Sequence, residues 1–522
     1  MPRARSRPRA VLLGLAAALV AEGVLGGCSL GNVHVDACTA DDECVLAFGL
    51  GSSCDAEGYC SDAASCQTGF DCHERFGGGA CVAGTCSDVL PTLPGCTVSE
   101  PTALAGVRLT GPGSPLVLGS LFATDEQADM AYSAAARLAV REINTAGGLV
   151  DGRELAMLVC DIGGPGNALT GDARRDAVRG ALDALAGTLG VPGLVGPSTS
   201  VDSLTAIGHV LASGYPTVLV SPSATSPALT TEPDKLAPSD PAGLFWRTAA
   251  SDELQGQVLV DFVIGQYPVA AVITRLAVVY VQDAYGQGLA NVVLQRFGSA
   301  STDLFPYDAA TNLGALAAQV AAANPDGVLV VSLRAVDTVA ILQEMALTSL
   351  AAKHFYFTDG SKESSVLLDA TLPQVVKDII LGAAGTAPAA PRGPIFDQFN
   401  ASLLADFGLD ATQWSFLANA YDASYALGYA SVFALSPGVP FDGRKLGEGL
   451  GRLSGGPAID VGPSGWSSAK AALSAGPLAI DMTGTSGPLD FDPATGEAPG
   501  PIEIWRVLPD LSGFEELSVV VP

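Results

Sequence analysis

Residues 116–160 carry the pattern that decides the fold, and they read LVLGSLFATDEQADMAYSAAARLAVREINTAGGLVDGRELAMLVC. The apolar run 116–123 predicts a strand. Residues 125–144 follow, with apolar side chains spaced by three and four positions, which is typical of an amphipathic helix. The glycine pair 147–148 ends that helix, and the apolar run 155–160 predicts a second strand. The stretch is one strand–helix–strand unit, the building block of a parallel sheet.

The same alternation continues along the chain. Further strands are expected at 193–196, 216–220, 275–281, 327–333, 354–357 and 379–383, with helices at 172–189, 201–212, 285–297 and 336–347. The strands are apolar on both faces, which is typical of a parallel sheet covered by helices on both sides. Two such series predict an α/β protein with two doubly wound, Rossmann-like sheets. Ligands in such sheets bind beyond the carboxyl ends of the strands.

The composition of the chain excludes some classes of partner. Of the 522 residues, 48% are hydrophobic and 15% are charged, and the formal net charge is -28. This apolar fraction suits a large buried core and not a disordered chain. A surface with so strong an excess of acidic groups repels phosphate backbones, so we expect no nucleic-acid partner.

The N-terminus has the order of a secretion signal. Four arginines within residues 1–9 precede the apolar run 11–20, which is shorter than the roughly 20 residues that cross a bilayer. The next motif, LGGC at 25–28, resembles the lipobox of bacterial lipoproteins. This resemblance implies that residues 1–27 are removed and that Cys28 is acylated and anchors the chain to a membrane. Because Ser29 follows the cysteine, the resemblance implies that the protein is located in the outer membrane, at its periplasmic face or at the cell surface. The alternative is an ordinary signal peptide followed by a chance cysteine.

A cysteine-rich segment follows the signal. Two repeats have the spacings C-x5-C-x9-C-x5-C and C-x5-C-x8-C-x4-C, formed by Cys38, Cys44, Cys54 and Cys60 and by Cys66, Cys72, Cys81 and Cys86. Few apolar residues lie between these cysteines, so residues 28–105 are expected to form a stalk held by two disulfides per repeat, with the pairing left open. Zinc binding is the weaker alternative, because the gaps do not match structural zinc sites. Cys96 and Cys160 remain, and either they pair or Cys160 is a buried thiol.

Six segments in the rest of the chain resemble, in order, the periplasmic branched-chain amino-acid (Leu/Ile/Val) binding proteins. They are RLAVREINTAGGLVDGR at 137–153, SPSATSP at 221–227, FWRTAASD at 245–252 with Gln255-Gly256, DAYGQG at 283–288, AYD at 420–422 and GPLDFD at 487–492. The resemblance implies a type I solute-binding domain over 106–522, with two lobes joined by a three-segment hinge. Lobe one would hold 106–247 and 384–483, and lobe two 248–383 and 484–522.

The resemblance also implies where a ligand binds in the first lobe. Hydroxyl and N–H groups of Ser198, Thr199 and Ser200, between a strand and a helix, would hold a carboxylate. Ser223 and Thr225 match the second pocket loop of the family. The alternative for all five residues is a role as helix caps and turn residues, which serine and threonine favour in any protein.

The second lobe would supply three further contacts. Tyr285 matches an aromatic residue that covers the ligand when the lobes close, with packing at a helix start as the alternative. Asp359 matches the acidic residue that accepts the ligand's ammonium group, and its alternative is a solvated turn. Arg334 lies near the place where the family often has a tyrosine. Its cation would favour an acidic ligand, unless the side chain points into solvent.

No enzymatic chemistry is expected. The four histidines are scattered, and the sequence contains no nucleophile elbow and no phosphate-binding loop. We therefore expect no catalytic residue, no metal and no cofactor. The expected function is capture of a small polar ligand, an amino acid or a related compound, for an ABC permease. The alternative is a surface sensor or interaction receptor that uses the same two lobes without transport.

Overall fold

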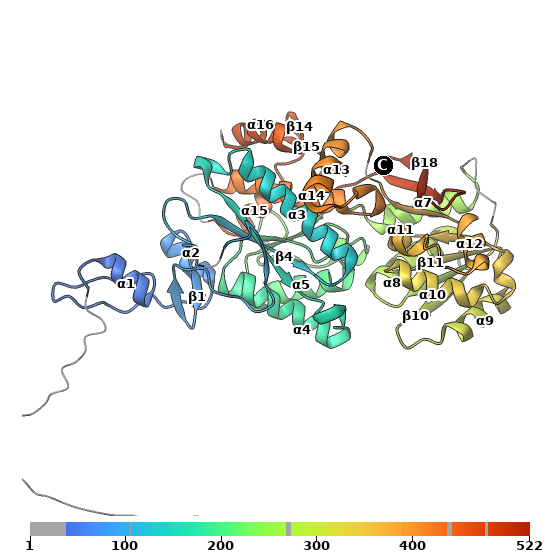
Figure 1. The fold of residues 1–522 in the computed structure, drawn as a ribbon, viewed down its shortest axis with the longest axis horizontal. Helices are drawn as coiled ribbons and strands as arrows, with labels where there is room; N and C mark the ends of the chain where they lie inside the picture. The colour runs from blue at the N-terminus through green and yellow to red at the C-terminus, as the bar shows by residue number, and fades with distance from the viewer. Residues whose placement is uncertain are drawn as a thin grey trace, which may run out of the picture.

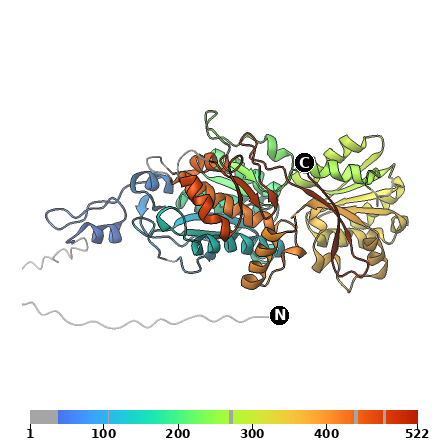
Figure 2. The same cartoon turned by 90° about the horizontal axis from the view of Figure 1, so that it is seen from above.

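The computed structural model describes residues 38–521 apart from 105, 268–272, 390, 436–440 and 475–478. Two α/β lobes lie side by side, and the cysteine-rich repeats lie at the end of the first lobe that is far from the second (Figures 1 and 2). The expected signal peptide and Cys28 lie outside the described residues. Among the described helices, none is both long and apolar enough to span a bilayer.

The first lobe contains a six-stranded sheet of order β3-β5-β4-β6-β7-β8. Its strands are β3 Val98–Glu100, β4 Leu116–Phe122, β5 Leu155–Asp161, β6 Gly193–Val195, β7 Val218–Ser221 and β8 Phe245–Arg247. All pairs are parallel except β3 with β5. Every residue of β4 is buried, as the apolar runs predicted.

Helices cover both faces of this sheet. In Figure 1, α3 and α14 lie on one face and α4 and α5 on the other. The helices of this lobe are α3 Gln127–Thr145, α4 Gly171–Leu182, α5 Ser200–Ser213, α6 Ala228–Thr231, α13 Pro394–Phe407, α14 Leu417–Ala434, α15 Gly443–Leu450 and α16 Pro463–Ser474. A small second sheet contains β14 Ala458–Asp460, β15 Asp481–Gly484 and β16 Gly487–Pro488.

The second lobe contains a seven-stranded sheet of order β10-β9-β11-β12-β13-β17-β18. Its strands are β9 Leu276–Val281, β10 Thr302–Tyr307, β11 Gly327–Val331, β12 His354–Phe357, β13 Ala384–Pro388, β17 Ile502–Val507 and β18 Phe514–Val520. The first five strands are parallel to one another. Strand β17 is antiparallel to β13, and β18 is antiparallel to β17. Its helices are α7 Asp252–Val263, α8 Ala284–Phe297, α9 Leu313–Ala323, α10 Ala335–Met345, α11 Ser364–Leu367 and α12 Gln374–Leu381. The prediction of two doubly wound lobes is confirmed.

The chain crosses between the lobes three times, between β8 and α7, between β13 and α13, and between β16 and β17. Two predicted lobe boundaries are wrong. Residues 384–388 form β13 in the second sheet. Leu489, Phe491 and Ala498 pack in the first lobe's core, so lobe two resumes near residue 501 and not at 484.

The strand predicted at 379–383 is also wrong. Ile379 and Ile380 lie in α12, and the strand comes directly afterwards, as β13. Val376, Ile379 and Ile380 are the buried residues of that helix, at the spacing of three and four positions that gives a helix an apolar face. A short apolar run was therefore mistaken for a strand.

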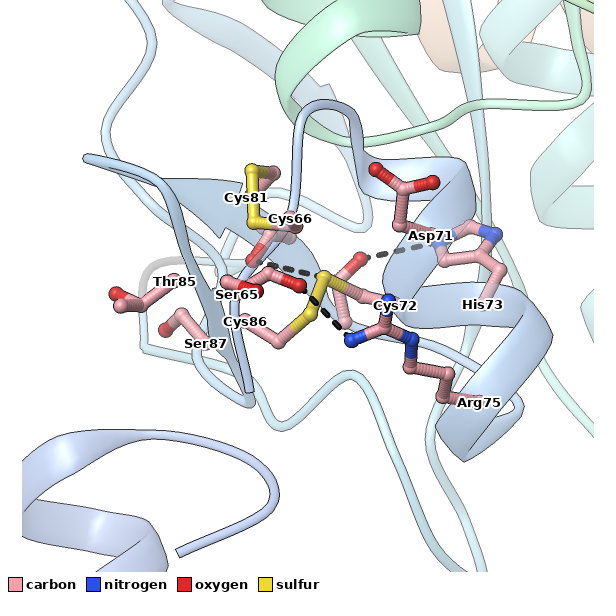
Figure 3. The surroundings of a disulfide bond; sticks show 12 residues. Ser65, Cys66, Asp71, Cys72, His73, Arg75, Cys81, Thr85, Cys86 and Ser87 are labelled. Atoms are coloured by element: carbon pink, nitrogen blue, oxygen red, sulfur yellow. Dashed lines mark hydrogen bonds between the residues drawn. A yellow bond between two sulfur atoms is a disulfide. The ribbon is translucent and has the colours of Figure 1, made fainter. Parts of the chain in front are cut away.

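The cysteine-rich segment contains α1 Asp41–Phe48, α2 Gly69–Phe76, β1 Ala80–Val82 and β2 Thr85–Ser87. Each repeat pairs its first cysteine with its third and its second with its fourth: Cys38–Cys54, Cys44–Cys60, Cys66–Cys81 and Cys72–Cys86. Figure 3 shows the two disulfides of the second repeat close together, with Arg75 donating to the Ser65 carbonyl beside them. The expectation of two disulfides per repeat is confirmed.

A fifth disulfide joins Cys96 to Cys160. The antiparallel pairing of β3 with β5 sets Val98 opposite Val159, which brings the two cysteines together. Of the two alternatives that the sequence left open for Cys160, the structure selects the disulfide. This bond ties the cysteine-rich segment to β5, the strand next to the edge of the first lobe's sheet.

Candidate ligand-binding site between the lobes

Three of the five predicted hydroxyl groups of the first lobe hold its loops together. The Thr199 hydroxyl caps α5 by accepting from the Asp202 N–H at 3.1 Å. The Ser200 hydroxyl accepts from the Ser226 N–H at 3.2 Å, and the Ser223 hydroxyl donates to the Ser198 carbonyl at 2.9 Å. Thr199 therefore plays the capping role that serine and threonine favour, whereas Ser200 and Ser223 join the loop after β6 to the loop after β7.

The other two hydroxyls, those of Ser198 and Thr225, are buried and have no hydrogen-bond partner among the described residues. Each lies beside a buried carboxylate, Ser198 beside Asp129 and Thr225 beside Asp252, so a ligand would compete with these carboxylates for the two hydroxyls. The Thr225 hydroxyl lies near the second lobe, because the Thr225 carbonyl accepts from the Asp252 N–H at 2.9 Å. The loop after β7 thus brings the Thr225 hydroxyl to the lobe boundary.

In the second lobe the structure brings the predicted residues Tyr285 and Asp359 into direct contact. The Tyr285 hydroxyl lies 2.9 Å from Oδ1 of Asp359 and 2.8 Å from Oγ1 of Thr358. Gln255 in α7 donates from Nε2 to the same Oδ1 atom at 2.8 Å and to the Thr386 carbonyl at 3.2 Å. Two donors therefore fix the Asp359 carboxylate, which is not a solvated turn group.

Sequence reasoning missed the most unusual group of the site, the carboxylate of Asp252. This residue begins α7 and is 0% exposed, and no ion pair joins its carboxylate to a cation of the described residues, so the Thr225 hydroxyl is the polar group beside it. Arg247, also fully buried, lies within range of its charge but donates to two backbone carbonyls and pairs with Glu497. The signal was present, because Asp252 ends the FWRTAASD segment, but the sequence did not show that it would be buried.

The two carboxylates Asp252 and Asp359 oppose each other electrostatically. Burial, followed by the charge of Asp359, raises the pKa of Asp252 well above its usual range, while the nearby Thr225 hydroxyl lowers it in part. Burial also raises the pKa of Asp359, against the hydrogen bonds from Gln255 and Tyr285. Two buried carboxylates that share a site favour a proton or an incoming cation. This pair is therefore suited to receive an ammonium group.

Arg334 does not join this buried group. It precedes α10, its side chain is 47% exposed, and it contacts Asp337 through Nε at 3.2 Å and Nη2 at 3.1 Å. Its cation is already paired with a carboxylate, which weakens the expectation that it selects an acidic ligand. The charge of Glu126, in the first lobe, lies within range of it.

The lobes touch through direct hydrogen bonds. The Ser226 hydroxyl donates to the Ala284 carbonyl at 2.8 Å, and the Ser364 hydroxyl donates to Oε1 of Gln413 at 2.5 Å. Ser226 and Gln413 belong to the first lobe, and Ala284 and Ser364 to the second. Beside these contacts Asp252 is 0% and Asp359 8% exposed, and electrostatic interactions are stronger at groups that are removed from water.

A metal ion does not fit the carboxylates of this site. Among the described residues, the groups of three or more potential ligand atoms within 4.8 Å of one another consist of cysteines, all of which are in disulfides. The carboxylate oxygens are too dispersed to surround one small cation, whereas Ca²⁺ requires six to eight oxygen ligands. An organic cation suits the arrangement better.

Asp129 in α3 gives the stability of the protein a pH dependence. Burial, followed by the charge of Glu126, raises the pKa of Asp129 to about 7. Between about pH 4 and pH 7 the folded state therefore binds more protons than the unfolded state, and the free energy of unfolding falls as the pH rises. Asp129→Asn keeps an acceptor for the Ala123 N–H, which Asp129 binds at 2.7 Å, and is expected to flatten this decline.

Denaturant unfolding at pH 5, 6 and 7 checks this prediction. The slope of the variant must be compared with that of the unaltered chain, because Asp422 also makes the free energy of unfolding fall as the pH rises. Burial raises the pKa of Asp422 to about 6. Equal slopes for the variant and the unaltered chain would contradict the assignment to Asp129.

Comparison with known structures identifies the fold. A leucine binding protein from Thermotoga maritima superposes with a TM-score of 0.59 at 15% identity, covering 78% of this chain and 99% of that one. The branched-chain amino acid transporter substrate binding protein of Streptococcus pneumoniae, in complex with isoleucine, gives 0.56 at 17% identity, covering 78% and 99%. A solute binding protein of an ABC transporter from Rhodopseudomonas palustris, in complex with 3,4-dihydroxybenzoic acid, gives 0.57 at 14% identity, covering 78% and 97%.

Comparison of sequences identifies the family. No curated protein matches the chain. The family model described as the receptor family ligand binding region matches residues 131–447, which is more than half of the chain. The chain therefore belongs to the family described as the receptor family ligand binding region, and it has the type I periplasmic binding protein fold.

Proposed function

We propose that this protein is an extracytoplasmic solute-binding protein that captures an amino acid or a related compound between its lobes and passes it to an ABC permease. The observation that carries the proposal is the buried carboxylate of Asp252, which forms no ion pair with a cation of the described residues and lies beside Asp359 and the Thr225 hydroxyl. A ligand that supplies an ammonium group would satisfy both carboxylates, and Ser198 and Thr225 would donate to its carboxylate. The protein performs no chemistry on the ligand.

Binding would stabilise the closed arrangement of the lobes. The acceptors Asp252 and Asp359 belong to the second lobe, whereas the hydroxyls of Ser198 and Thr225 belong to the first. A ligand held by both sets gains its full interaction energy when the lobes close about the three crossing segments. Tyr285 holds Asp359 in place through its hydroxyl and completes the ligand's surroundings.

The proposal includes a lipid anchor at Cys28, after removal of residues 1–27, and an outer-membrane address. The LGGC motif and Ser29 support it, and the disulfides from Cys38 onward suit an oxidising compartment outside the cytoplasm. A mass spectrum of the mature chain checks this part. It should show two or three acyl chains on an N-terminal Cys28, whereas an unacylated N-terminus would contradict it.

Thermal unfolding against a panel of amino acids, amides and small carboxylates tests the main proposal. A true ligand at 100 times its dissociation constant should add about 2.7 kcal/mol to the free energy of unfolding. A panel in which no compound shifts the midpoint, for the unaltered chain, would contradict solute capture.

A surface sensor is the second candidate, and the cysteine-rich repeats favour it. They extend from the first lobe at the end far from the second (Figure 2), where they would hold the lobes away from a membrane and offer a surface to a partner. Uptake of the ligand by cells that lack this chain separates the two functions. Uptake that needs the chain supports transport, and unchanged uptake with an altered response to the ligand supports sensing.

A further inference from the structure

The loop that carries Thr225 is held from outside the ligand site by one buried arginine. We call residues 222–227, between β7 and α6, the pocket loop. Arg247 is the last residue of β8 and is fully buried. Its Nη1 atom donates to the Ala224 carbonyl at 3.1 Å and to the Ser226 carbonyl at 3.0 Å. One side-chain nitrogen therefore fixes the backbone on both sides of Thr225.

Arg247 is itself held by the third crossing segment, residues 489–501. Its Nη2 atom pairs with the Glu497 carboxylate and donates to the Thr230 hydroxyl at 3.0 Å. The Thr230 hydroxyl donates to the same Glu497 oxygen at 2.5 Å, and the Arg247 N–H donates to the Gly496 carbonyl at 2.9 Å. A buried charge that loses its partner is left uncompensated. The counter-charge of Arg247 thus comes from a segment that joins the two lobes.

The first crossing segment, residues 248–251, starts directly after Arg247 and meets the same loop. At its end the Asp252 N–H donates to the Thr225 carbonyl at 2.9 Å. Asp252 is the first residue of α7, in the second lobe. Arg247 therefore links the pocket loop to two of the three segments that join the lobes, and its position influences how Thr225 lies relative to Asp252.

The pocket loop also carries a direct contact between the lobes. The Ser226 hydroxyl donates to the Ala284 carbonyl of the second lobe at 2.8 Å. One turn further along α8, a Cβ atom on Gly288 would lie only 2.9 Å from Oγ of Ser226 and from Cδ of Pro227. The backbone of α8 therefore approaches the loop as closely as glycine allows. So close a fit requires that the loop is held in one position where the lobes meet.

We infer that Arg247 and Glu497 are positioning residues for ligand binding, which act through the pocket loop and hold the Thr225 hydroxyl where a ligand between the closed lobes can reach it. The inference rests on the proposed function and adds to it a buried ion pair through which the crossing segments act on the site. An ion pair with a structural role alone would stabilise the first lobe and leave the pocket loop and the affinity unchanged. The experiments below separate these two roles.

Glu497→Gln and Thr230→Val test the inference without a ligand. The glutamine keeps the size and an acceptor oxygen of the glutamate but removes the counter-charge, and the valine removes one hydroxyl. Hydrogen exchange of the Asp252 amide, which donates to the Thr225 carbonyl, is expected to be about tenfold faster in each variant, because the loop that accepts this bond is held less firmly. The full chain is used for every variant.

Glu100→Gln is the matched control. Glu100 is also buried in the first lobe and pairs with Arg141, whose Nη2 atom lies 2.8 Å from its Oε2 atom. It lies in β3, at the edge of the sheet opposite β8, and contacts neither the pocket loop nor a crossing segment among the bonds of its side chain. Glu100→Gln should therefore leave the exchange rate of the Asp252 amide unchanged.

Stabilisation by a ligand shows whether the affinity follows the loop. The probe is an equimolar mixture of the twenty protein amino acids at a saturating concentration. If Glu497→Gln weakens binding tenfold, the gain in free energy of unfolding from the mixture falls by about 1.4 kcal/mol, whereas Glu100→Gln should keep the full gain. In a Thr225→Val background, Glu497→Gln should cause little further loss, because the hydroxyl through which the ion pair acts is already absent.

Two outcomes would overturn the inference and leave the proposed function standing. The first is an exchange rate of the Asp252 amide that Glu497→Gln changes no more than Glu100→Gln does. The second is a gain from the mixture that Glu497→Gln does not reduce, or reduces equally with and without Thr225→Val, since the ion pair would then not act through Thr225. A mixture that gives the unaltered chain no gain would contradict the capture of an amino acid and, with it, this inference.

Discussion

Asp359→Asn is expected to weaken ligand binding about 100-fold while raising the free energy of unfolding of the empty protein. In the unaltered chain Gln255 Nε2 and the Tyr285 hydroxyl lie 2.8 and 2.9 Å from Oδ1 of Asp359. The asparagine oxygen can still accept from both, so the local structure should persist. Loss of the charge removes a repulsion that raises the pKa of Asp252, so the free energy of unfolding should rise. The same loss deprives a ligand ammonium group of its acceptor, and truncating one partner of a buried charge pair costs about 2–5 kcal/mol of binding energy.

This test is specific because the stability and the ligand affinity of one variant are expected to change in opposite directions. Denaturant unfolding gives the stability, and calorimetric titration gives the affinity. The control is Asp308→Asn, which removes the same charge from a fully exposed turn of the second lobe, where hydrogen bonds from Thr311 and Ala310 lower the pKa of the carboxyl. That variant should lose a little stability and keep the affinity. An Asp359→Asn variant that loses both stability and binding would mean that Asp359 is a structural residue.

The fold could be predicted because its signals are local. The apolar run at 116–123 and the glycine pair at 147–148 bracket a helix, and the structure confirms a strand at Leu116–Phe122 and a helix at Gln127–Thr145. The pairing of Cys96 with Cys160 was left open because it depends on the antiparallel register of β3 and β5, which no single segment encodes.

The site was harder to predict because it depends on distant parts of the chain. The sequence placed Thr225, Tyr285 and Asp359 in it through resemblance, and the structure joins the last two by a hydrogen bond. Asp252 was missed because a carboxylate at the start of a helix is normally exposed to solvent, where it stabilises the helix by its interaction with the helix dipole. Asp252 is buried because the crossover segment that carries it packs against the loop at Thr225. Asp359, which lies near it in the fold, comes about a hundred residues later in the sequence.

The hydroxyl groups show the same limit. Serine and threonine at 198–200 and 223–225 fit both a ligand cradle and a set of helix caps, and the sequence contains no feature that separates the two. The structure divides them, since Thr199 caps its own helix, Ser200 and Ser223 join the two loops to each other, and the hydroxyls of Ser198 and Thr225 lie beside the buried carboxylates Asp129 and Asp252. Whether a polar atom has a partner in the folded protein depends on segments far apart in the chain, and this decides between a cap and a ligand contact.

Replacement of Cys72 and Cys86 by alanine is expected to unfold both cysteine-rich repeats and to leave the lobes intact. The disulfide closes a loop of about 15 residues, whose constraint is worth about 3 kcal/mol, and the repeats contain little other core. The first repeat depends on the second, because the Leu50 N–H donates to the Cys86 carbonyl at 2.7 Å and the Ala64 N–H donates to the Leu50 carbonyl at 2.8 Å. Hydrogen exchange should therefore show lost protection over residues 38–90.

The matched control removes the Cys44–Cys60 disulfide, which closes a loop of similar length in the first repeat. Protection should then be lost in the first repeat alone, since the second repeat packs on the first lobe through the close approach of Gly69 to Leu189 and Gly190. Neither double variant should change ligand affinity, because the site lies between the lobes. If both variants lose protection over the same residues, the two repeats unfold as one unit and the order of dependence argued from the Leu50–Cys86 contact is wrong.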